Sequence, residues 1–282
     1  MTRRRDLEHH RDSLADIGEI LSSMKTLAFM ETRKLARFLE AQQQVVQSIA
    51  DVAGDFLGFF PGLPSAPQEA TPVYLVVGSE RGFCGDFNRA VAKKLAVLVG
   101  DSVHDGARVI AVGQKLRSVL TDDPSVVAFI DGASVVEEVA AVLEQLIDRL
   151  SSLNATAAGV VVYGIHHDDN DVVVTPLLPP FAQDALVPPK YTLPPLLNVP
   201  PADFLGDLVD HYLFAALNGM LYASLMAENQ RRVSHLDGAV RHLEDESAEL
   251  TRRCKALRQE EIVEEIEVIL LSSAAGREDF AS

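Results

Sequence analysis

Apolar residues recur every seven positions along the first 60 residues of the chain. A second series, three residues after the first, runs from His10 to Val52 and is interrupted by Glu31. A 3–4 spacing sustained well beyond about four heptads predicts a coiled coil, because it keeps an apolar seam against a partner helix. Two amphipathic helices on a bundle are the alternative, although helices of globular domains rarely exceed about 20 residues. The first series is Leu7, Leu14, Leu21, Ala28, Leu35, Gln42, Ile49 and Phe56.

The C-terminal part of the chain repeats this spacing, with Ser247 as its polar interruption. The flanking positions are rich in Glu and Arg, as the solvated faces of a coiled coil are. Cys254 lies on the stripe, which predicts a small core residue. The stripe consists of Val233, Leu236, Val240, Leu243, Leu250, Cys254 and Leu257.

Proline divides the chain into three parts. All 14 prolines lie between Pro61 and Pro201, and proline removes a helix donor, so long helices are permitted at the two ends. We expect a helix over residues 1–60, an α/β domain with a proline-rich connector over 61–201, and a second helix over 202–282. At 1.5 Å per residue the helices would span roughly 80 Å and roughly 110 Å. Because one helix enters the compact domain and the other leaves it, the two would pair antiparallel.

The middle of the chain alternates short β-branched runs with helical stretches, which predicts βαβ crossovers and a mainly parallel sheet with helices on both faces. We expect a hairpin loop at GIHHDDND, residues 164–171, and an extended surface connector over 176–201. The fold class is therefore a Rossmann-like α/β domain inserted between two long helices that form an antiparallel coiled coil. The predicted strands are 73–77, 109–112, 126–130, 160–163 and 172–175, and the predicted helices are 88–99, 114–120 and 135–150.

Composition restricts the possible partners. The formal net charge of −16 disfavours nucleic acid and anionic lipid headgroups as direct partners. The two cysteines form no C-x-x-C pair and no secretory leader precedes the first helix, which favours a reduced, cytoplasmic setting. The longest apolar tract, 204–227, is interrupted by Asp207, Asp210 and His211, so we do not expect it to span a membrane.

A glycine-rich turn, SERGFCGDFN, follows the first predicted strand. Such a turn often cradles phosphate, yet neither G-x-G-x-x-G nor G-x-x-x-x-G-K-[ST] fits its glycines. No Lys follows Gly85, and Asp86 would repel a phosphate. We therefore expect no nucleotide site, no cofactor and no small-molecule substrate.

Other candidate sites are weak. His166, His167, Asp168, Asp169 and Asp171 could suggest a metal site, but their spacing does not fit an EF-hand loop, and a solvated turn is the better interpretation. Cys84 could expose a thiol in the turn, but no His or Lys close in sequence would activate it. No nucleophile–base or paired-carboxylate signature appears, so the chain is expected to be non-catalytic on its own.

The longer helix would extend past its partner, and the extension carries an apolar stripe of Ile262, Ile266, Ile269 and Leu270. An isolated apolar helix end is unstable in water. The stripe therefore predicts a protein partner that encloses it.

Taken together, these motifs resemble the gamma subunit of F-type ATP synthases, and the resemblance covers nearly the whole chain. The family's turn reads close to S-[DE]-R-G-[LF]-C-G-x-[FL]-N, which Ser79–Asn88 fits with Asp86 at the variable position. ILSSMKTLA matches the family's N-terminal helix, and RQEEIVEEIEVILLSSA matches its C-terminal helix. The turn residues that match are Ser79, Glu80, Arg81, Gly82, Cys84, Gly85 and Asn88. The helical residues that match are Ile20, Met24, Lys25, Ala28, Arg33, Arg258, Gln259, Ile262, Glu265 and Ile269.

The chain departs from the family pattern in its C-terminal helix. Val263 replaces a threonine, Val268 an acid, and Ser272–Ser273 a Gly-Ala pair. These departures resemble the divergent, alternative (N-ATPase-like) bacterial type, which we favour over an ordinary synthase of a distant lineage. They leave open whether protons or sodium ions are coupled.

The resemblance implies a central-stalk subunit that rotates inside the ring of alpha and beta subunits and couples ion translocation to ATP synthesis or hydrolysis. It also implies an epsilon subunit and a membrane c-ring as partners, and a peripheral position on the cytoplasmic face of a bacterial plasma membrane. The implied ring or rotor contacts are Met24, Lys25, Arg33, Arg258, Gln259, Ile262, Glu265, Ile266 and Ile269. For Arg258 and Gln259 a solvated helix face is the alternative, and the ring contact is the favoured interpretation.

Two other classes of protein remain as alternatives. A coiled-coil scaffold or adaptor would not affect ATPase activity. A small-molecule enzyme would bind its ligand at the carboxyl ends of the strands and would be stabilised by it. Neither explains three motifs in order at these separations.

Overall fold

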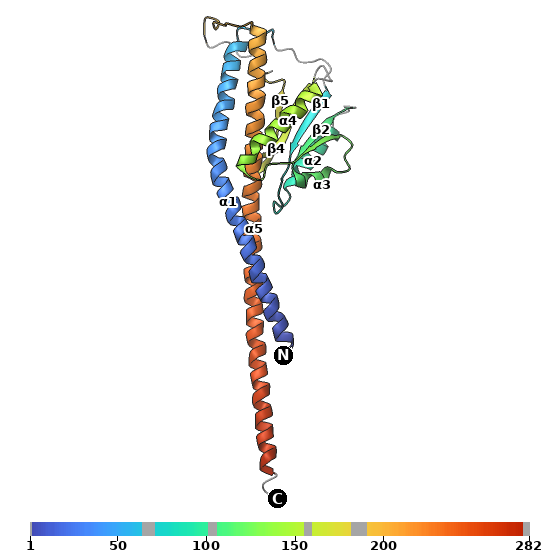
Figure 1. Cartoon of the computed structure of the whole chain (residues 1–282), viewed down its shortest axis with the longest axis vertical. Helices are drawn as coiled ribbons and strands as arrows, with labels where there is room; N and C mark the ends of the chain where they lie inside the picture. Colours follow the sequence, from blue (N-terminus) through green and yellow to red (C-terminus); the bar gives the residue numbers. More distant parts are fainter. Residues whose placement is uncertain (1, 64–70, 101–105, 155–159, 182–190, 279–282) are drawn as a thin grey trace. The chain divides into compact units, whose positions relative to one another are not determined.

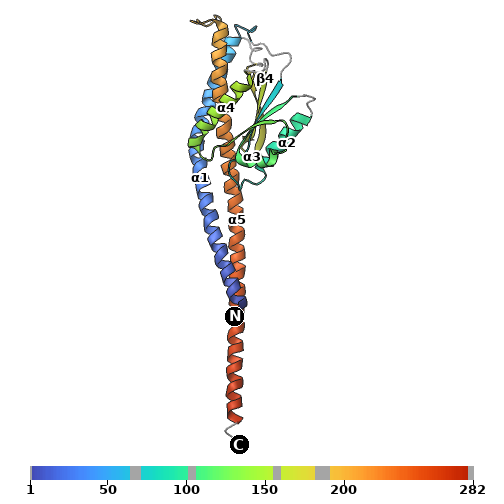
Figure 2. The ribbon, with the colours of Figure 1, turned by 45° about the vertical axis from the view of Figure 1, so that its right-hand side comes forward.

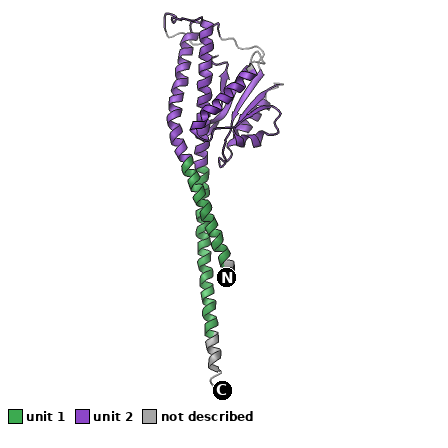
Figure 3. Cartoon of the chain, viewed as in Figure 1, with its two compact units in different colours: residues 1–27, 234–282 green, residues 28–233 purple. Residues whose placement is uncertain are grey.

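The computed structural model describes residues 2–63, 71–100, 106–154, 160–181 and 191–278. These residues form two compact units (Figure 3). Unit 1 contains residues 1–27 and 234–282, and unit 2 contains residues 28–233. Helices α1 (Thr2–Leu57) and α5 (Pro201–Glu278) each contribute to both units.

In unit 1, α1 and α5 pair antiparallel. Arg4 Nε lies 2.9 Å from Glu261 Oε2, and Lys25 Nζ lies 3.1 Å from Asp237 Oδ1, so rising numbers on one helix meet falling numbers on the other. The predicted C-terminal stripe forms the seam: Leu236, Leu250 and Cys254 are buried, and the other members from Val240 to Leu257 are partly buried. Past Glu261, α5 continues beyond the N-terminal end of α1 (Figures 1 and 2). The predicted coiled coil and the core position of Cys254 are confirmed.

The same two helices pair antiparallel in unit 2. Gln42 Nε2 donates to the carbonyl oxygen of Ala215 at 3.3 Å, and the rings of Phe56 and Phe204 lie 4.9 Å apart. Leu35 is fully buried in the core that α5 shares with the sheet. Aromatic side chains close the end of the pair, where α1 stops and α5 begins.

The second apolar series of α1 does not lie in the seam. Ile17, Phe38, Val45 and Val52 remain exposed, whereas every member of the first series is partly or fully buried. The buried flank instead follows the first series by four residues, from Arg11 to Ala53. A single partner helix covers only one side of α1, so the a/d assignment was wrong for this second series. The exposed side chains give α1 a further apolar stripe.

Unit 2 contains one five-stranded sheet in the order β3-β2-β1-β4-β5. β1 pairs parallel with β2 and β4, β2 pairs parallel with β3, and β5 is antiparallel to β4. The predicted mixed, mainly parallel sheet is confirmed. The strands are β1 (Thr71–Val77), β2 (Arg108–Val112), β3 (Val126–Ile130), β4 (Val160–Asp168) and β5 (Asp171–Leu178), and the helices between them are α2 (Phe87–Gly100), α3 (Gln114–Leu120), the 3-10 turn η1 (Val136–Glu138) and α4 (Val139–Asn154).

Both faces of the sheet are covered. α4 and α5 pack on one face, where Leu75, Leu146 and Leu221 share a core. α2 and α3 pack on the other face, where Val76 and Leu95 share a second core (Figures 1 and 2). Strands buried on both sides explain why the sequence shows unbroken β-branched runs there.

Two expectations about the end of the sheet were wrong. β4 continues to Asp168, so His166 and His167 lie in a strand and are buried rather than in a solvated loop. His167 stacks on Phe87 with ring centroids 3.9 Å apart, and its Nε2 lies 3.0 Å from the Phe87 carbonyl oxygen. β5 likewise continues to Leu178, because Leu177 is buried in the sheet core. Part of the predicted connector, residues 182–190, lies outside the described residues.

Candidate functional site

The glycine turn is held in shape by a pair of side chains at its two ends. Asn88 Oδ1 accepts the backbone N–H of Ser79 at 2.8 Å, and Asn88 Nδ2 donates to Ser79 Oγ at 2.8 Å. Gly85 adopts a φ of 63°, in the left-handed region that favours glycine. Phe83 has the same φ and is 49% exposed.

The backbone N–H groups of this turn do bind an anion, but the anion is a carboxylate side chain of the same protein. The N–H groups of Glu80 and Arg81 donate to the two carboxylate oxygens of Glu228 on α5, both at 3.2 Å. Glu228 is 3% exposed and also accepts a charged hydrogen bond from Arg232, one helical turn further on. The donors that would hold a phosphate in a nucleotide-binding turn are therefore used to fasten the turn to α5.

Arg232 completes the contact. Its Nε donates to the carbonyl oxygen of Gly82 at 3.1 Å, and its Nη1 donates to Asn229 Oδ1 at 2.8 Å. It is 4% exposed, so both charges of the Glu228–Arg232 pair are buried. Removing one partner of such a pair strongly destabilises the folded protein, because the other charge stays buried without compensation. We call residues 79–88 together with Glu228–Arg232 the turn–helix joint.

Two further side chains extend the joint across the end of the sheet. Arg231 donates to Asp86 Oδ1 at 2.8 Å and to the carbonyl oxygen of Asn170 at 3.0 Å, which connects α5 to the β4–β5 hairpin. Glu80 Oε2 accepts the N–H groups of Gln114 at 2.9 Å and Gly132 at 2.7 Å, after β2 and β3. The turn therefore links α5 to the carboxyl ends of three parallel strands and to the hairpin beside them.

Burial controls the ionisation of the joint. It raises the pKa of the Glu228 carboxyl, against the opposing effect of the Arg232 guanidinium and the two turn N–H groups. It also raises the pKa of the Cys84 thiol to about 11, with the Glu228 carboxylate acting in the same direction. Cys84 is 5% exposed, with its sulfur 3.5 Å from Arg232 Nη2. A buried thiol of this kind is structural rather than nucleophilic.

The sequence-predicted contact residues do not gather at one place. Met24 is half-buried, Lys25 is paired with Asp237, and the Arg33 guanidinium lies 5.7 Å from the centre of the Phe29 ring. The turn residues all belong to the joint. The C-terminal residues Arg258, Gln259, Ile262, Glu265, Ile266 and Ile269 are exposed along the last part of α5.

The α5 half of the joint was missed at the sequence level. The buried positions of α5 recur every three or four residues between Leu225 and Leu236, and Glu228 and Arg232 lie on two of them. Two charges on a buried stripe could have indicated a buried partner. The identity of that partner could not be read from the sequence, because Glu80 lies 148 residues away from Glu228.

Gly78, just before the turn, and Gly82, within it, allow the packing of the turn to be tested. A Cβ added to Gly78 would lie 2.5 Å from Asn88 Oδ1 and 2.5 Å from Leu116 Cβ, whereas a Cβ on Gly82 meets nothing within 4 Å. We expect Gly78→Ala to lower the free energy of unfolding of unit 2 by about 1–3 kcal/mol through overpacking. Gly82→Ala should change it by less than about 0.5 kcal/mol. Urea denaturation of the two variants would check this, and equal losses would contradict the packing described here.

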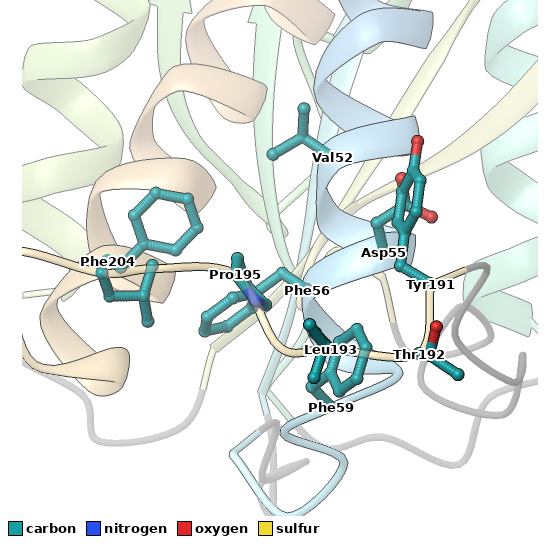
Figure 4. Close-up of a pocket in the computed structure, with 10 residues that line it drawn as sticks. Val52, Asp55, Phe56, Phe59, Tyr191, Thr192, Leu193, Pro195 and Phe204 are labelled. Carbon is teal, nitrogen blue, oxygen red and sulfur yellow. The ribbon is translucent and has the colours of Figure 1, made fainter.

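A separate cavity of about 540 Å³ lies at the other end of unit 2 (Figure 4). Phe56 of α1, Phe59 just after the end of α1 and Phe204 of α5 form one side, and residues 191–197 form the other. Asp55 contributes the one charged group among the described lining residues. The lining can bury apolar surface but brings together no nucleophile and base.

The fold and the turn–helix joint together define a structural subunit, in which an α/β sheet is fastened by buried charges to paired long helices. The family model described as ATP synthase matches residues 3–275. The chain belongs to this family, as a gamma chain.

Individual relatives agree with this assignment. The ATP synthase gamma chain of Clostridium beijerinckii is 22% identical over 280 residues, which cover 93% of this chain and 94% of that one. The gamma chain of Clostridium novyi is 25% identical over 206 residues, which cover 70% of each chain.

Solved structures share the fold. A chain in the OSCP/F1/c-ring assembly of Euglena gracilis mitochondrial ATP synthase has a TM-score of 0.65 at 15% identity, and the match covers 97% of this chain and 94% of that one. A chain in the central stalk and c-ring of Tetrahymena thermophila mitochondrial ATP synthase has a TM-score of 0.56 at 18% identity, with 78% and 99% covered. Among the described helices of the present chain, none combines the length and apolar character needed to cross a membrane.

Proposed function

We propose that this gamma chain is the rotating shaft of an ATP synthase and couples ion translocation across the membrane to ATP synthesis or hydrolysis. The observation that carries the proposal is the turn–helix joint. Glu228 and Arg232 connect α5 to the sheet domain through directional, charge-assisted hydrogen bonds in a buried setting. Such bonds resist sliding and rotation of the helix better than apolar contact alone, because each fixes a direction as well as a distance. A torque applied to the sheet domain would therefore pass into the helix pair.

The outer surface of unit 1 supports enclosure by a ring of alpha and beta subunits. Ile17, Ile20 and Leu27 of α1 are 46%, 60% and 61% exposed and lie at helical spacing around half-buried Met24. A contiguous apolar stripe of this kind marks a protein interface more often than a solvated face. Met24 and Arg33 remain proposed ring contacts. Lys25 would have to leave Asp237 to make such a contact.

The last part of α5 supports the same partner. Ile262, Val263 and Ile266 are 46%, 54% and 50% exposed. A ring that closes around this tip would remove their apolar surface from water. We propose that Arg258 and Gln259 provide the polar contacts beside this apolar tip, since an Arg fork can pair with a carboxylate at a fixed angle.

The sheet domain is the proposed contact for an epsilon subunit and the membrane c-ring. The assemblies that contain the structural relatives, described as central stalk with c-ring and as F1 with c-ring, support this. We accordingly propose a peripheral position on the cytoplasmic face of a bacterial plasma membrane. We also propose the three-part organisation into residues 1–60, 61–201 and 202–282.

Reconstitution with the alpha and beta subunits of an ATP synthase from the same organism would test the proposal. We expect the full chain to copurify with the ring and to raise its multi-site ATP hydrolysis several-fold over the ring alone. The measurement is steady-state hydrolysis with and without the chain, at equal ring concentration. If the chain neither copurifies with the ring nor changes hydrolysis, the coiled-coil scaffold becomes the better interpretation.

A further inference from the structure

The interface between β4 and α5 contains two buried polar side chains that stand out from an apolar surrounding. His166 on β4 is 6% exposed and Ser224 on α5 is 2% exposed. Among the described residues, neither His166 Nδ1 nor Ser224 Oγ has a hydrogen-bond partner. The rest of this interface is built from side chains such as Leu221 and Leu225 of α5 and Val77 of β1. Buried polar groups nearly always form hydrogen bonds, so two that form none at these atoms need an explanation.

The register of strand and helix places the two side chains at the same level. Gly164 lies against Met220, since an added Cβ would be 2.5 Å from the Met220 sulfur. His166 follows on the same face of the strand by about 6.6 Å, and Ser224 follows on the same face of the helix by about 6 Å. β4 and α5 run in the same direction here, because β1 is parallel to β4 and Glu228 meets the turn that follows β1. His166 therefore faces the part of α5 that carries Ser224.

The surroundings of His166 provide no counterion. On α5 the charged groups are Glu228 and Arg232, which are bonded to each other and to the turn. On β4 the neighbour His167 points to the opposite sheet face, and on β5 the paired residue is Val173. α1 and α4 contribute apolar side chains to this core, and no carboxylate in the described ranges forms an ion pair with His166. Burial lowers the pKa of His166 to about 4, and His167 acts in the same direction.

We propose that the β4–α5 interface is an acid-sensitive contact in which His166 is the proton sensor, so that protonation of His166 favours release of α5 from the sheet. The inference rests on the proposed function, in which torque passes from the sheet domain into α5. Release of α5 from the sheet would interrupt that transmission. In the closed interface a charged imidazole has neither water nor a counterion. In the opened interface it has water.

The sign follows from the two protonation equilibria. In the opened form His166 regains its ordinary pKa of 6.5, whereas in the closed form its pKa is about 4. The opened form therefore binds the proton more readily, and the stabilising effect of the neutral imidazole is present above pH 6.5 and lost as the pH falls toward 4. Between about pH 7.5 and about pH 5.5 the ratio of opened to closed form rises about tenfold. Glu228 acts with the opposite sign because its pKa is raised, so the test compares variants that share it.

Cys84 is the natural reporter of this opening, because its buried thiol lies in the turn that α5 covers. The experiment uses the full chain with Cys254→Ser, so that Cys84 is the only thiol, and 4,4′-dithiodipyridine, which reacts with thiols in mild acid. Labelling rates are divided by those of the urea-unfolded chain at the same pH. The pH range stays above the isoelectric point of about 4.8. We expect the ratio of this relative rate at about pH 5.5 to that at about pH 7.5 to be about tenfold larger in the parent chain than in a chain whose residue 166 does not titrate.

Non-titrating variants decide the outcome. His166→Leu should lower this ratio about tenfold, while His211→Leu, which replaces an exposed histidine of the same helix α5, should leave it as in the parent chain. His166→Gln keeps a polar side chain and serves if the leucine variant does not fold, which tyrosine fluorescence reports. The same ratio in the His166 variants and in the parent chain would overturn the proposal. The assay uses the chain alone, so failure to bind the alpha–beta ring would reject the shaft and leave the sensor intact.

Discussion

Replacing Arg232 by leucine is expected to lower the free energy of unfolding of unit 2 by about 3–5 kcal/mol. The substitution leaves the Glu228 carboxylate buried with only the N–H groups of Glu80 and Arg81. It also removes the Arg232 donor from the carbonyl oxygen of Gly82, which keeps only the weaker Cys84 S–H donor. All five tyrosines of the chain lie between residues 28 and 233, and the chain has no tryptophan, so tyrosine fluorescence during urea denaturation reports on this unit.

The matched control is Arg117→Leu. Arg117 and its partner Asp131 are 50% and 75% exposed, and their pair lies in the same unit at 3.4 Å. An exposed pair contributes less than about 1 kcal/mol, so this variant should unfold almost like the parent chain. Equal losses for Arg117→Leu and Arg232→Leu would show that the turn–helix joint does not hold the sheet domain on α5.

A double variant separates charge from packing. Adding Glu228→Gln to Arg232→Leu removes the uncompensated charge, while the amide oxygen can still accept an N–H group of the turn. We expect the double variant to be more stable than Arg232→Leu alone, because a buried unpaired charge costs more than a buried amide. If the double variant is the less stable of the two, packing rather than charge dominates the joint.

The sheet was predictable because its strands are buried on both faces. The run from Val126 to Ile130 was placed at its observed bounds, and β1 and β2 begin two residues and one residue earlier than predicted. β4 and β5 instead run five and three residues past their predicted ends. Helix α3 (Gln114–Leu120) was also placed as observed. Local hydrophobic patterns are sufficient to predict such elements, because their bounds depend mainly on which side chains are buried.

Only half of the candidate site could be predicted, because a local sequence pattern does not show which distant residue a buried side chain contacts. The motif identified the turn, but Glu228 reaches it across 148 residues of chain. His166 and His167 were assigned to a loop because polar residues crowd that stretch, yet both are buried in β4. On α1, the periodicity identified two apolar series. It could not show which series packs against α5 and which stays exposed, because that depends on how the two helices meet.

Removing the end of α5 is the second large test. The segment after Leu257 carries Ile262, Val263 and Ile266, each about half exposed in the free chain. If a ring of alpha and beta subunits buries the exposed half of these side chains, each would contribute about 1 kcal/mol, or about 3 kcal/mol together. A chain truncated after Leu257 should therefore bind the ring about a hundredfold more weakly. Titration of labelled chain against the assembled ring would measure this.

The truncated chain should keep its sheet domain, because none of the joint residues lies beyond Arg232. Its tyrosine-detected unfolding should match that of the parent chain, which separates loss of the tip from loss of the fold. The substitutions Ile262→Ser and Ile266→Ser together should weaken binding in the same direction, whereas Glu264→Ser, on an exposed polar position of the same turn, should not. Unchanged affinity for the truncated chain would mean that the apolar tip is not enclosed by the ring. The exposed stripe of Ile17, Ile20 and Leu27 would then have to hold the shaft in place.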